Sequence, residues 1–197
     1  MRKIIIVPLL ALFAVACAPL RAYRNNNPLP PSETISDGTH DITVSYVEFD
    51  DHGLFWTDDQ LPNALRNVKA AQSPDGALVA VFVHGWLNNA SKDNGDVANF
   101  KAKVLIPLSQ RETVLAAEQH RPRRKVAGVF LGWRGLSVSF TPLFVTSFAD
   151  REAAADRVAG THATSTIRAL VRTTREDRLH GSQIIVMTSG TTAGPTC

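Results

Sequence analysis

The chain has 197 residues, of which 44% are hydrophobic and 20% are charged, and it contains 12 Gly, 11 Pro and 2 Cys. This composition is that of an ordinary globular protein and excludes collagen-like, coiled-coil and largely disordered chains. A chain of this length can bury a core without a disulfide framework or a structural metal. The formal charge of +3 gives only a weak indication of binding to nucleic acid or anionic lipid.

Residues 1–16 are predicted to be a signal peptide. Arg2 and Lys3 precede a run of thirteen uncharged residues, 4–16, which is shorter than a spanning helix and is interrupted by Pro8. Removal of this segment leaves 19 Lys and Arg against 18 Asp and Glu. The basic balance therefore comes mostly from the signal peptide, and it no longer points to a nucleic-acid partner.

The sequence Ala14-Val15-Ala16-Cys17 resembles the lipobox of bacterial lipoproteins, with Ala14 where such motifs usually carry Leu. The resemblance implies that Cys17 is diacylated, and plain secretion with cleavage is the alternative. Ala18 follows the cysteine in place of Asp, which by the sorting rule of these proteins implies the outer membrane. We therefore expect a protein of the bacterial cell envelope, facing the periplasm or secreted. Residues 17–40 are polar and rich in Pro, and they predict a lipid-anchored tether.

The first regular elements are predicted after residue 40. Apolar and polar residues alternate over 41–49 and predict a strand, which is followed by a turn at 50–53 and a short returning strand at 54–56. Residues 58–72 carry apolar groups at helical spacing and predict a helix.

Three continuous apolar runs, residues 77–83, 126–131 and 184–187, predict strands that are buried on both faces. Helical patterns lie between them, over 97–108, where Pro107 is expected to kink or divide the helix, and over 148–174. The alternation of strand and helix predicts an α/β fold with a mostly parallel sheet.

Ligands of open α/β sheets bind at the carboxyl ends of the strands. His84-Gly85-Trp86 follows the first buried run, and Gly132-Trp133-Arg134-Gly135 follows the second. With their spacing and strand order, the two motifs resemble those of bacterial α/β-hydrolases of the serine esterase or lipase type, over about residues 46–187. The resemblance implies a three-layer sandwich, of which residues 41–197 form a part that lacks the later strands.

The resemblance also implies roles for these residues. Gly85 lets the backbone approach a substrate carbonyl, and the N–H of Trp86 donates to the oxyanion of an acyl-transfer intermediate. His84, Trp133 and Arg134 are candidate residues of the substrate cleft. The alternatives are a hydrogen-bonded structural histidine for His84, core packing for Trp133 and a surface ion pair for Arg134.

The nucleophile motif Gly-x-Ser-x-Gly, expected after residues 184–187, is missing. Thr192 occupies its place in a Gly-x-Thr-x-Gly pattern, but a β-branched residue suits a strained elbow poorly, and Pro195 falls in the helix that should follow. Ser189 has no glycines at the right offsets. The alternative for 188–197 is an irregular tail. No Asp, Glu or His follows Thr192, so the acid and base of the family are absent.

We therefore expect the N-terminal part of a serine-hydrolase-type envelope lipoprotein, truncated at the nucleophile elbow and inactive as this chain. An ester or acyl compound would be its substrate if it were active, and the oligomeric state stays open. The alternative is a non-catalytic envelope lipoprotein that uses the α/β scaffold for binding. We expect no metal or cofactor, because no Cys/His cluster has zinc spacing and no phosphate loop follows a strand. Two further expectations are a solvated basic loop at 121–125 and an exposed apolar edge at the third run.

Overall fold

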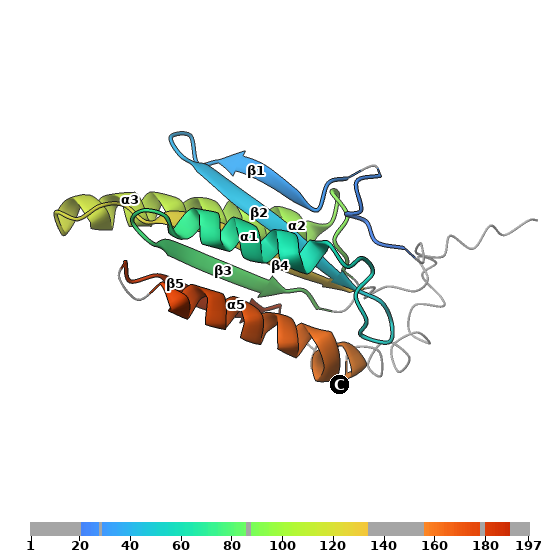
Figure 1. The fold of residues 1–197 in the computed structure, drawn as a ribbon. Coiled ribbons are helices and arrows are strands. Elements are labelled where there is room, and N and C mark those ends of the chain that lie inside the picture. The colour runs from blue at the N-terminus through green and yellow to red at the C-terminus, as the bar shows by residue number, and fades with distance from the viewer. Residues whose placement is uncertain (1–20, 28, 86–87, 134–155, 178–179, 190–197) are drawn as a thin grey trace, which may run out of the picture.

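The computed structural model describes residues 21–27, 29–85, 88–133, 156–177 and 180–189. Its centre is one sheet with the strand order β1-β2-β4-β3-β5, in which β1 is antiparallel to β2 and every other neighbouring pair is parallel (Figure 1). The strands are β1 (Ser32–Ser36), β2 (Asp41–Phe49), β3 (Ala77–Val83), β4 (Lys125–Trp133) and β5 (Gln183–Thr188). The predicted α/β class with a mostly parallel sheet is confirmed.

Helices cover both faces of the sheet. The helices are α1 (Gln60–Gln72), α2 (Gly95–Asn99), α3 (Ile106–Glu118) and α5 (Thr164–Glu176), with the π-helical segments η1 (Phe100–Leu105) and η3 (Ala159–Ala163). One face carries α1 and α5, and the other carries α2, η1 and α3 (Figure 1). The described chain is therefore a three-layer α/β arrangement.

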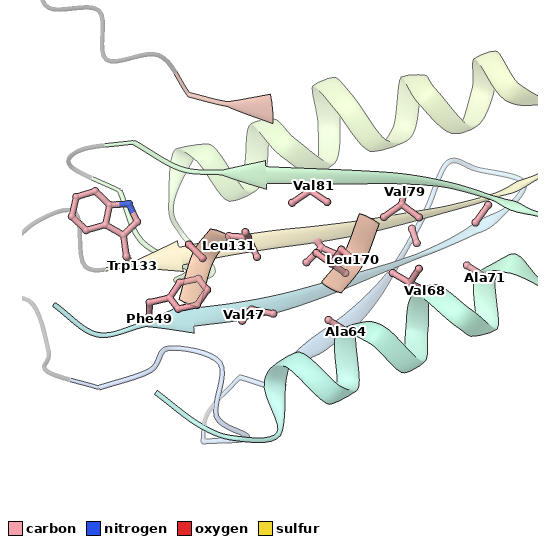
Figure 2. Packing of buried hydrophobic residues seen from close by; sticks show 14 of the residues in the cluster. Val47, Phe49, Ala64, Val68, Ala71, Val79, Val81, Leu131, Trp133 and Leu170 are labelled. Carbon is pink, nitrogen blue, oxygen red and sulfur yellow. The ribbon is translucent and has the colours of Figure 1, made fainter. Parts of the chain in front are cut away.

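The apolar run of β3 has this composition because the strand is buried on both faces. Val79 and Val81 pack with Val68 of α1 and Leu170 of α5, as Figure 2 shows. The alternate residues Leu78 and Ala80 belong to a second cluster on the face of η1. A central parallel strand has no solvated face, so its sequence cannot alternate between apolar and polar residues.

The segment predicted as a tether is partly regular. Its residues 32–36 form β1, which pairs with β2 in a register that joins Ser36 to Asp41, so an irregular segment up to residue 40 is wrong for this part. Ile35 is the one large apolar residue of β1, and an edge strand with so little apolar surface leaves no periodic pattern in the sequence.

Three other predictions meet different outcomes. The returning strand at 54–56 is wrong, since that segment makes one isolated bridge, between Phe49 and Phe55. The division near Pro107 is confirmed, because the chain passes from η1 into α3 and Pro107 lies in the first turn of α3, where its missing N–H costs little. Of the helix predicted at 148–174, the described part runs from residue 156 to Glu176.

The strand β5 is the outermost strand at one end of the sheet order. Ile185 and Val186 are 46% and 42% exposed, which is unusual for large apolar side chains. The expectation of an exposed apolar edge is therefore confirmed for the described residues.

Candidate functional site

The carboxyl ends of β3, β4 and β5 meet at one edge of the sheet, with β3 in the middle. After β3 the chain passes to α2 and η1 on one face of the sheet. After β4 the described chain continues in η3 and α5, which lie on the opposite face with α1. Connections that depart to opposite faces open a crevice at the strand ends, and ligands of α/β proteins bind there. The geometry thus places the candidate site at the ends of β3 and β4.

His84 directly follows β3 and is 3% exposed. The backbone N–H of Trp133 donates to His84 Nε2 at 2.7 Å, and the indole Nε1–H of Trp133 donates to the His84 carbonyl at 3.1 Å. Since Nε2 accepts, Nδ1 carries the proton and donates to the Gly85 carbonyl at 2.8 Å. Both ring nitrogens of His84 are therefore committed to the backbone.

Burial lowers the pKa of His84 to about 4, so the imidazole is neutral at neutral pH. Its ring stacks on that of Trp133 at 5.6 Å between centroids and on that of Phe130 at the same distance. These contacts are those of a structural histidine. They fix the end of β3 against the end of β4, and the Trp133 ring itself packs into the core cluster of the α1 and α5 face.

Gly85 lies against the residue that follows β5. A Cβ added to Gly85 would lie 2.7 Å from Ser189 Oγ and 3.2 Å from the Ser189 carbonyl oxygen. The Ser189 N–H donates to the Val83 carbonyl at 3.1 Å, which extends the pairing of β3 and β5 by one residue. A close approach between two chain segments therefore favours glycine at position 85. The Ser189 hydroxyl oxygen is buried and has no hydrogen-bond partner among the described residues.

A further polar cluster, around Glu48, lies at the same end of the sheet, and the sequence did not predict it. Glu48, near the end of β2, is 3% exposed and accepts hydrogen bonds from the backbone N–H groups of Tyr23 and Arg24 at 2.9 and 2.7 Å. Gln60 Oε1 accepts from the Glu48 N–H at 2.7 Å, and Gln60 Nε2 donates to the Arg24 carbonyl at 2.8 Å. Burial raises the pKa of Glu48, against the effect of these donors. We call residues 21–27 the N-terminal strap.

Arg24 connects this strap to the loop that follows β3. Its Nε–H donates to the Ala90 carbonyl at 3.0 Å, and its guanidinium carbon lies 3.8 Å from the centroid of the Tyr46 ring. A Cβ added to Gly132 would lie 3.0 Å from Ala90 Cβ and 3.2 Å from Glu48 Cγ. Gly132 therefore allows the loop and the strap cluster to meet. The sequence signal was Glu48 itself, a carboxylate in line with Ile42, Val44 and Tyr46 on an apolar strand face.

The opposite, amino end of the sheet carries a different polar cluster. Glu112 of α3 has a fully buried side chain and binds Arg121 at 2.5 Å and Arg124 at 3.0 Å. Burial alone would raise the pKa of Glu112, but the hydrogen bonds from these arginines outweigh it and lower the pKa to about 2. The Ser109 hydroxyl donates to Asp37 Oδ2 at 2.6 Å, and this hydrogen bond is the main cause that holds the pKa of the Asp37 carboxyl well below its usual range. The expectation of a solvated basic loop at 121–125 is therefore wrong for Arg121 and Arg124.

Four predicted positions, Cys17, Trp86, Arg134 and Thr192, lie outside the described residues. The other three lie at the ends of β3 and β4, where His84 is hydrogen-bonded both to Trp133 and to the Gly85 carbonyl. In the described ranges, no helix is long and apolar enough to cross a membrane, and no group of three or more His, Cys, Asp or Glu side chains could hold a metal ion.

No family model, curated protein or solved structure matches this chain.

Proposed function

We propose that the domain is a scaffold of the serine-hydrolase type that binds a carboxylic ester or another acyl compound at the carboxyl ends of β3, β4 and β5, without turning it over. The observation that supports this most is the contact between Gly85 and Ser189. The Ser189 hydroxyl, just after β5, lies close to the backbone of Gly85, just after the neighbouring strand β3. Because Ser189 Oγ is buried, an ester carbonyl would reach it only after Gly85 and Ser189 move apart, and it would then meet the hydroxyl on one side and backbone N–H groups on the other.

The His84-Gly85-Trp86 sequence supplies the turn in this proposal. Gly85 removes the side chain that would fill the space beside Ser189, and the N–H of Trp86 is the proposed oxyanion donor. Arg134 remains a proposed cleft residue. Trp133 contributes indirectly, because both of its N–H groups hold His84 and thereby fix the end of β3.

The absence of turnover follows from the protonation and contacts of His84. A serine hydroxyl is a poor nucleophile unless a base removes its proton. His84 Nε2, the one ring nitrogen able to accept a proton, already accepts from the Trp133 N–H, and burial lowers its pKa to about 4. The Ser189 hydroxyl, for its part, contacts no base among the described residues. Ser189 thus replaces Thr192 as the hydroxyl on which the proposal depends.

The place of action in this proposal is the outer membrane of a bacterial envelope, with Cys17 as the lipidated residue. The support is the resemblance of residues 14–17 to a lipobox. The competing class is a non-catalytic lipoprotein whose ligand is not an acyl compound, and the experiment below separates the two.

The test uses the full chain and a fluorescent octanoyl amide, which resembles an ester but resists hydrolysis. We expect saturable binding by fluorescence anisotropy, together with neither hydrolysis of short acyl esters nor labelling by a fluorophosphonate. Gly85→Ala should weaken binding by about tenfold, which corresponds to about 1.4 kcal/mol, because the new methyl group would occupy the space beside Ser189 that the acyl carbonyl is proposed to enter. Gly95→Ala is the matched control, since a Cβ there meets nothing within 4 Å.

Two outcomes contradict the proposal. Covalent labelling of Ser189 or Thr192 would show an active nucleophile and overturn the absence of turnover. No binding of the amide by a folded chain would favour a scaffold with another ligand. Equal binding by the Gly85→Ala and wild-type chains would show that the amide binds away from Gly85 and Ser189, and would overturn the proposed site.

A further inference from the structure

The outermost strand β5 leaves one side of its backbone without a neighbouring strand in the described sheet. Its residues Gln183–Thr188 include neither a charged residue nor Pro, the features with which edge strands usually prevent pairing with another chain. The Ser189 N–H donates to the Val83 carbonyl of β3. Because peptide groups alternate in direction along a strand, the N–H groups of Ile184 and Val186 point to the opposite side. These groups are therefore available to a further strand.

The two faces of β5 have different surroundings. Val186 pairs with Val81 and lies on the face of α1 and α5. Ile185 pairs with Ala80 and lies on the face of η1 and α3. Because Ile185 is 46% exposed, a strand added beside it would bury apolar surface on this face. We therefore expect the added strand to carry apolar side chains here.

Helix α5 borders the edge on the other face. It contacts β3 and β5, whereas α1 contacts chiefly β2 and β4, so the flank of α5 turned away from α1 lies on the side of the β5 edge (Figure 1). Glu176 marks the flank toward α1, because it faces Lys69 at 3.9 Å. With about 3.6 residues per turn, Ile167 and Val171 lie on the opposite flank.

This edge-side flank is basic. The charged residues of α5 are three arginines and Glu176. The arginines are exposed, and none of them has a charged partner among the described residues. A surface hollow on the helix is lined by Ile167, Arg168, Val171, Arg172, Arg175 and Glu176. The arginines are thus suited to carboxylates of a partner.

The nearby acidic residues leave this charge in place. Between residue 156 and the end of β5, the described chain has three of them. Glu176 faces a lysine at 3.9 Å, and Asp177 contacts a histidine at 2.7 Å. Asp156 precedes η3, at the other end of the helical segment. Asp75, from the turn before β3, lines a separate hollow at the amino end of the sheet.

We propose that the β5 edge and the basic flank of α5 form a docking surface for an extended segment of a partner protein, in which acidic and apolar residues alternate. The segment pairs with β5 as a further strand. Its acidic side chains face the arginines of α5, and its apolar side chains lie beside Ile185. Side chains on one face of a strand repeat every 6.7 Å or about that, and Arg168 and Arg172 are separated by a rise of about 6 Å. The inference is independent of the ligand proposed above.

A second copy of this chain fits the surface less well. Antiparallel pairing of two β5 strands would place both α5 helices on the same face of the joined sheet. Their unpaired arginines would then approach one another, and like charges repel. An acidic segment neutralises the same arginines instead.

The test uses the full chain and two fluorescein-labelled peptides of six residues, the length of β5. In one peptide Val and Glu alternate, and in the other three Val precede three Glu, so that charge and composition are equal. We expect the alternating peptide to bind about tenfold more tightly in fluorescence anisotropy, because only it matches both faces. Hydrogen exchange should slow at the amides of Ile184 and Val186 when it binds.

Charge reversal tests the arginines. Arg168→Glu combined with Arg175→Glu should weaken binding of the alternating peptide by about tenfold or more, because two attractions become repulsions. Arg66→Glu is the matched control, since it reverses an exposed arginine on α1 and should leave binding within about twofold. All three side chains are exposed, so these variants should fold.

Four outcomes would overturn the proposal. They are no binding of the alternating peptide, equal binding of the two peptides, equal losses in the double variant and in Arg66→Glu, and unchanged exchange at Ile184 and Val186 in the complex. A dimer of the chain alone in sedimentation, abolished by Val186→Pro, would assign the edge to a second copy and overturn the acidic partner as well.

Discussion

The two ends of the sheet hold their loops by different means. At the carboxyl end, a neutral histidine donates to and accepts from the backbone, and a buried carboxylate accepts backbone N–H groups. At the amino end, the fully buried Glu112 carboxylate binds two arginines. At the carboxyl end, burial shifts the pKa values of His84 and Glu48 in the directions that favour their neutral forms. The amino end depends on charged groups.

This difference teaches how each end of the sheet joins segments that are far apart in the sequence. Salt bridges at the amino end join α3 to the segment that leads into β4, and Arg121 and Arg124 also line a surface hollow there. At the carboxyl end the polar groups lie at the strand ends, and the glycines at positions 85 and 132 allow segments to approach closely without side chains. The carboxyl end is therefore held by hydrogen bonds to the backbone and by close packing of chain segments.

The largest expected effect is at the amino end, with Glu112→Gln. Removal of one partner of a buried ion pair leaves the other charge without compensation, and we expect a loss of roughly 3 kcal/mol in the free energy of unfolding. Glu118→Gln on the same helix is the matched control, because its side chain is exposed and should change stability by less than about 0.5 kcal/mol. Urea denaturation measures both. Similar losses for the two variants would contradict the role given to Glu112.

The second effect separates the two ends by pH. Because burial lowers the folded-state pKa of His84 from 6.5 to about 4, the unfolded chain takes up a proton that the folded chain resists. Stability is therefore full above pH 6.5 and falls by about 3 kcal/mol as the pH decreases to 4. The pKa of Glu112, lowered from 4.5 to about 2, gives a contribution that is present above pH 4.5 and is lost toward pH 2. Acid should weaken the carboxyl end first.

Urea denaturation at pH 7, 5 and 4 measures this difference. His84→Gln should be less stable than the wild-type chain at pH 7 but should lose much less stability between pH 6.5 and 4. His52→Gln, which changes an exposed histidine, should keep the wild-type pH dependence. A wild-type pH dependence in His84→Gln would show that another group titrates in this range.

The sequence predicted the elements whose burial is uniform. The runs that form β3 and β4 are apolar on both faces because helices cover both, and such runs are recognised without knowledge of their neighbours. The strand β1 could not be recognised, because pairing with β2 determines its conformation and its own side chains are mostly polar. The π-helical segment η1 could not be recognised either, because a π-helical turn leaves no sequence pattern that differs from that of an ordinary helix.

The sequence could indicate where in the fold the candidate site residues lie, but not their contacts. His84 and Gly85 could be placed because they close an apolar run, and strand ends of α/β sheets are where ligands bind. The hydrogen bonds between Trp133 and His84 join residues 49 positions apart, and those between Arg24 and Ala90 join residues 66 apart. No local pattern encodes such pairs. The position of the Glu48 carboxylate on an apolar strand face could only indicate that some partner exists.

The third effect tests the close packing at the carboxyl end. Gly132→Ala places a methyl group 3.0 Å from Ala90 Cβ and 3.2 Å from Glu48 Cγ. The neighbours must move, and we expect a loss of about 1–3 kcal/mol from overpacking. Gly95→Ala, with open space around the new methyl group, should be neutral or slightly stabilising. A neutral Gly132→Ala would show that the loop after β3 can shift without cost and that the strap does not fix it.

The smallest loss of stability is expected at an exposed ion pair of the amino end, which is compared here with the buried Glu112. Lys69 and Glu176 join α1 to α5 at 3.9 Å, with side chains 64% and 56% exposed. Water and salt screen such a pair, so Lys69→Met should change the free energy of unfolding by at most about 1 kcal/mol. That change should shrink further at 1 M NaCl, because salt screens exposed charges more than buried ones. The loss in Glu112→Gln should persist at high salt, since its side chain is shielded from solvent. If both variants responded equally to salt, the amino end would owe its stability to surface charge rather than to the buried carboxylate, and the contrast between the two ends would fail.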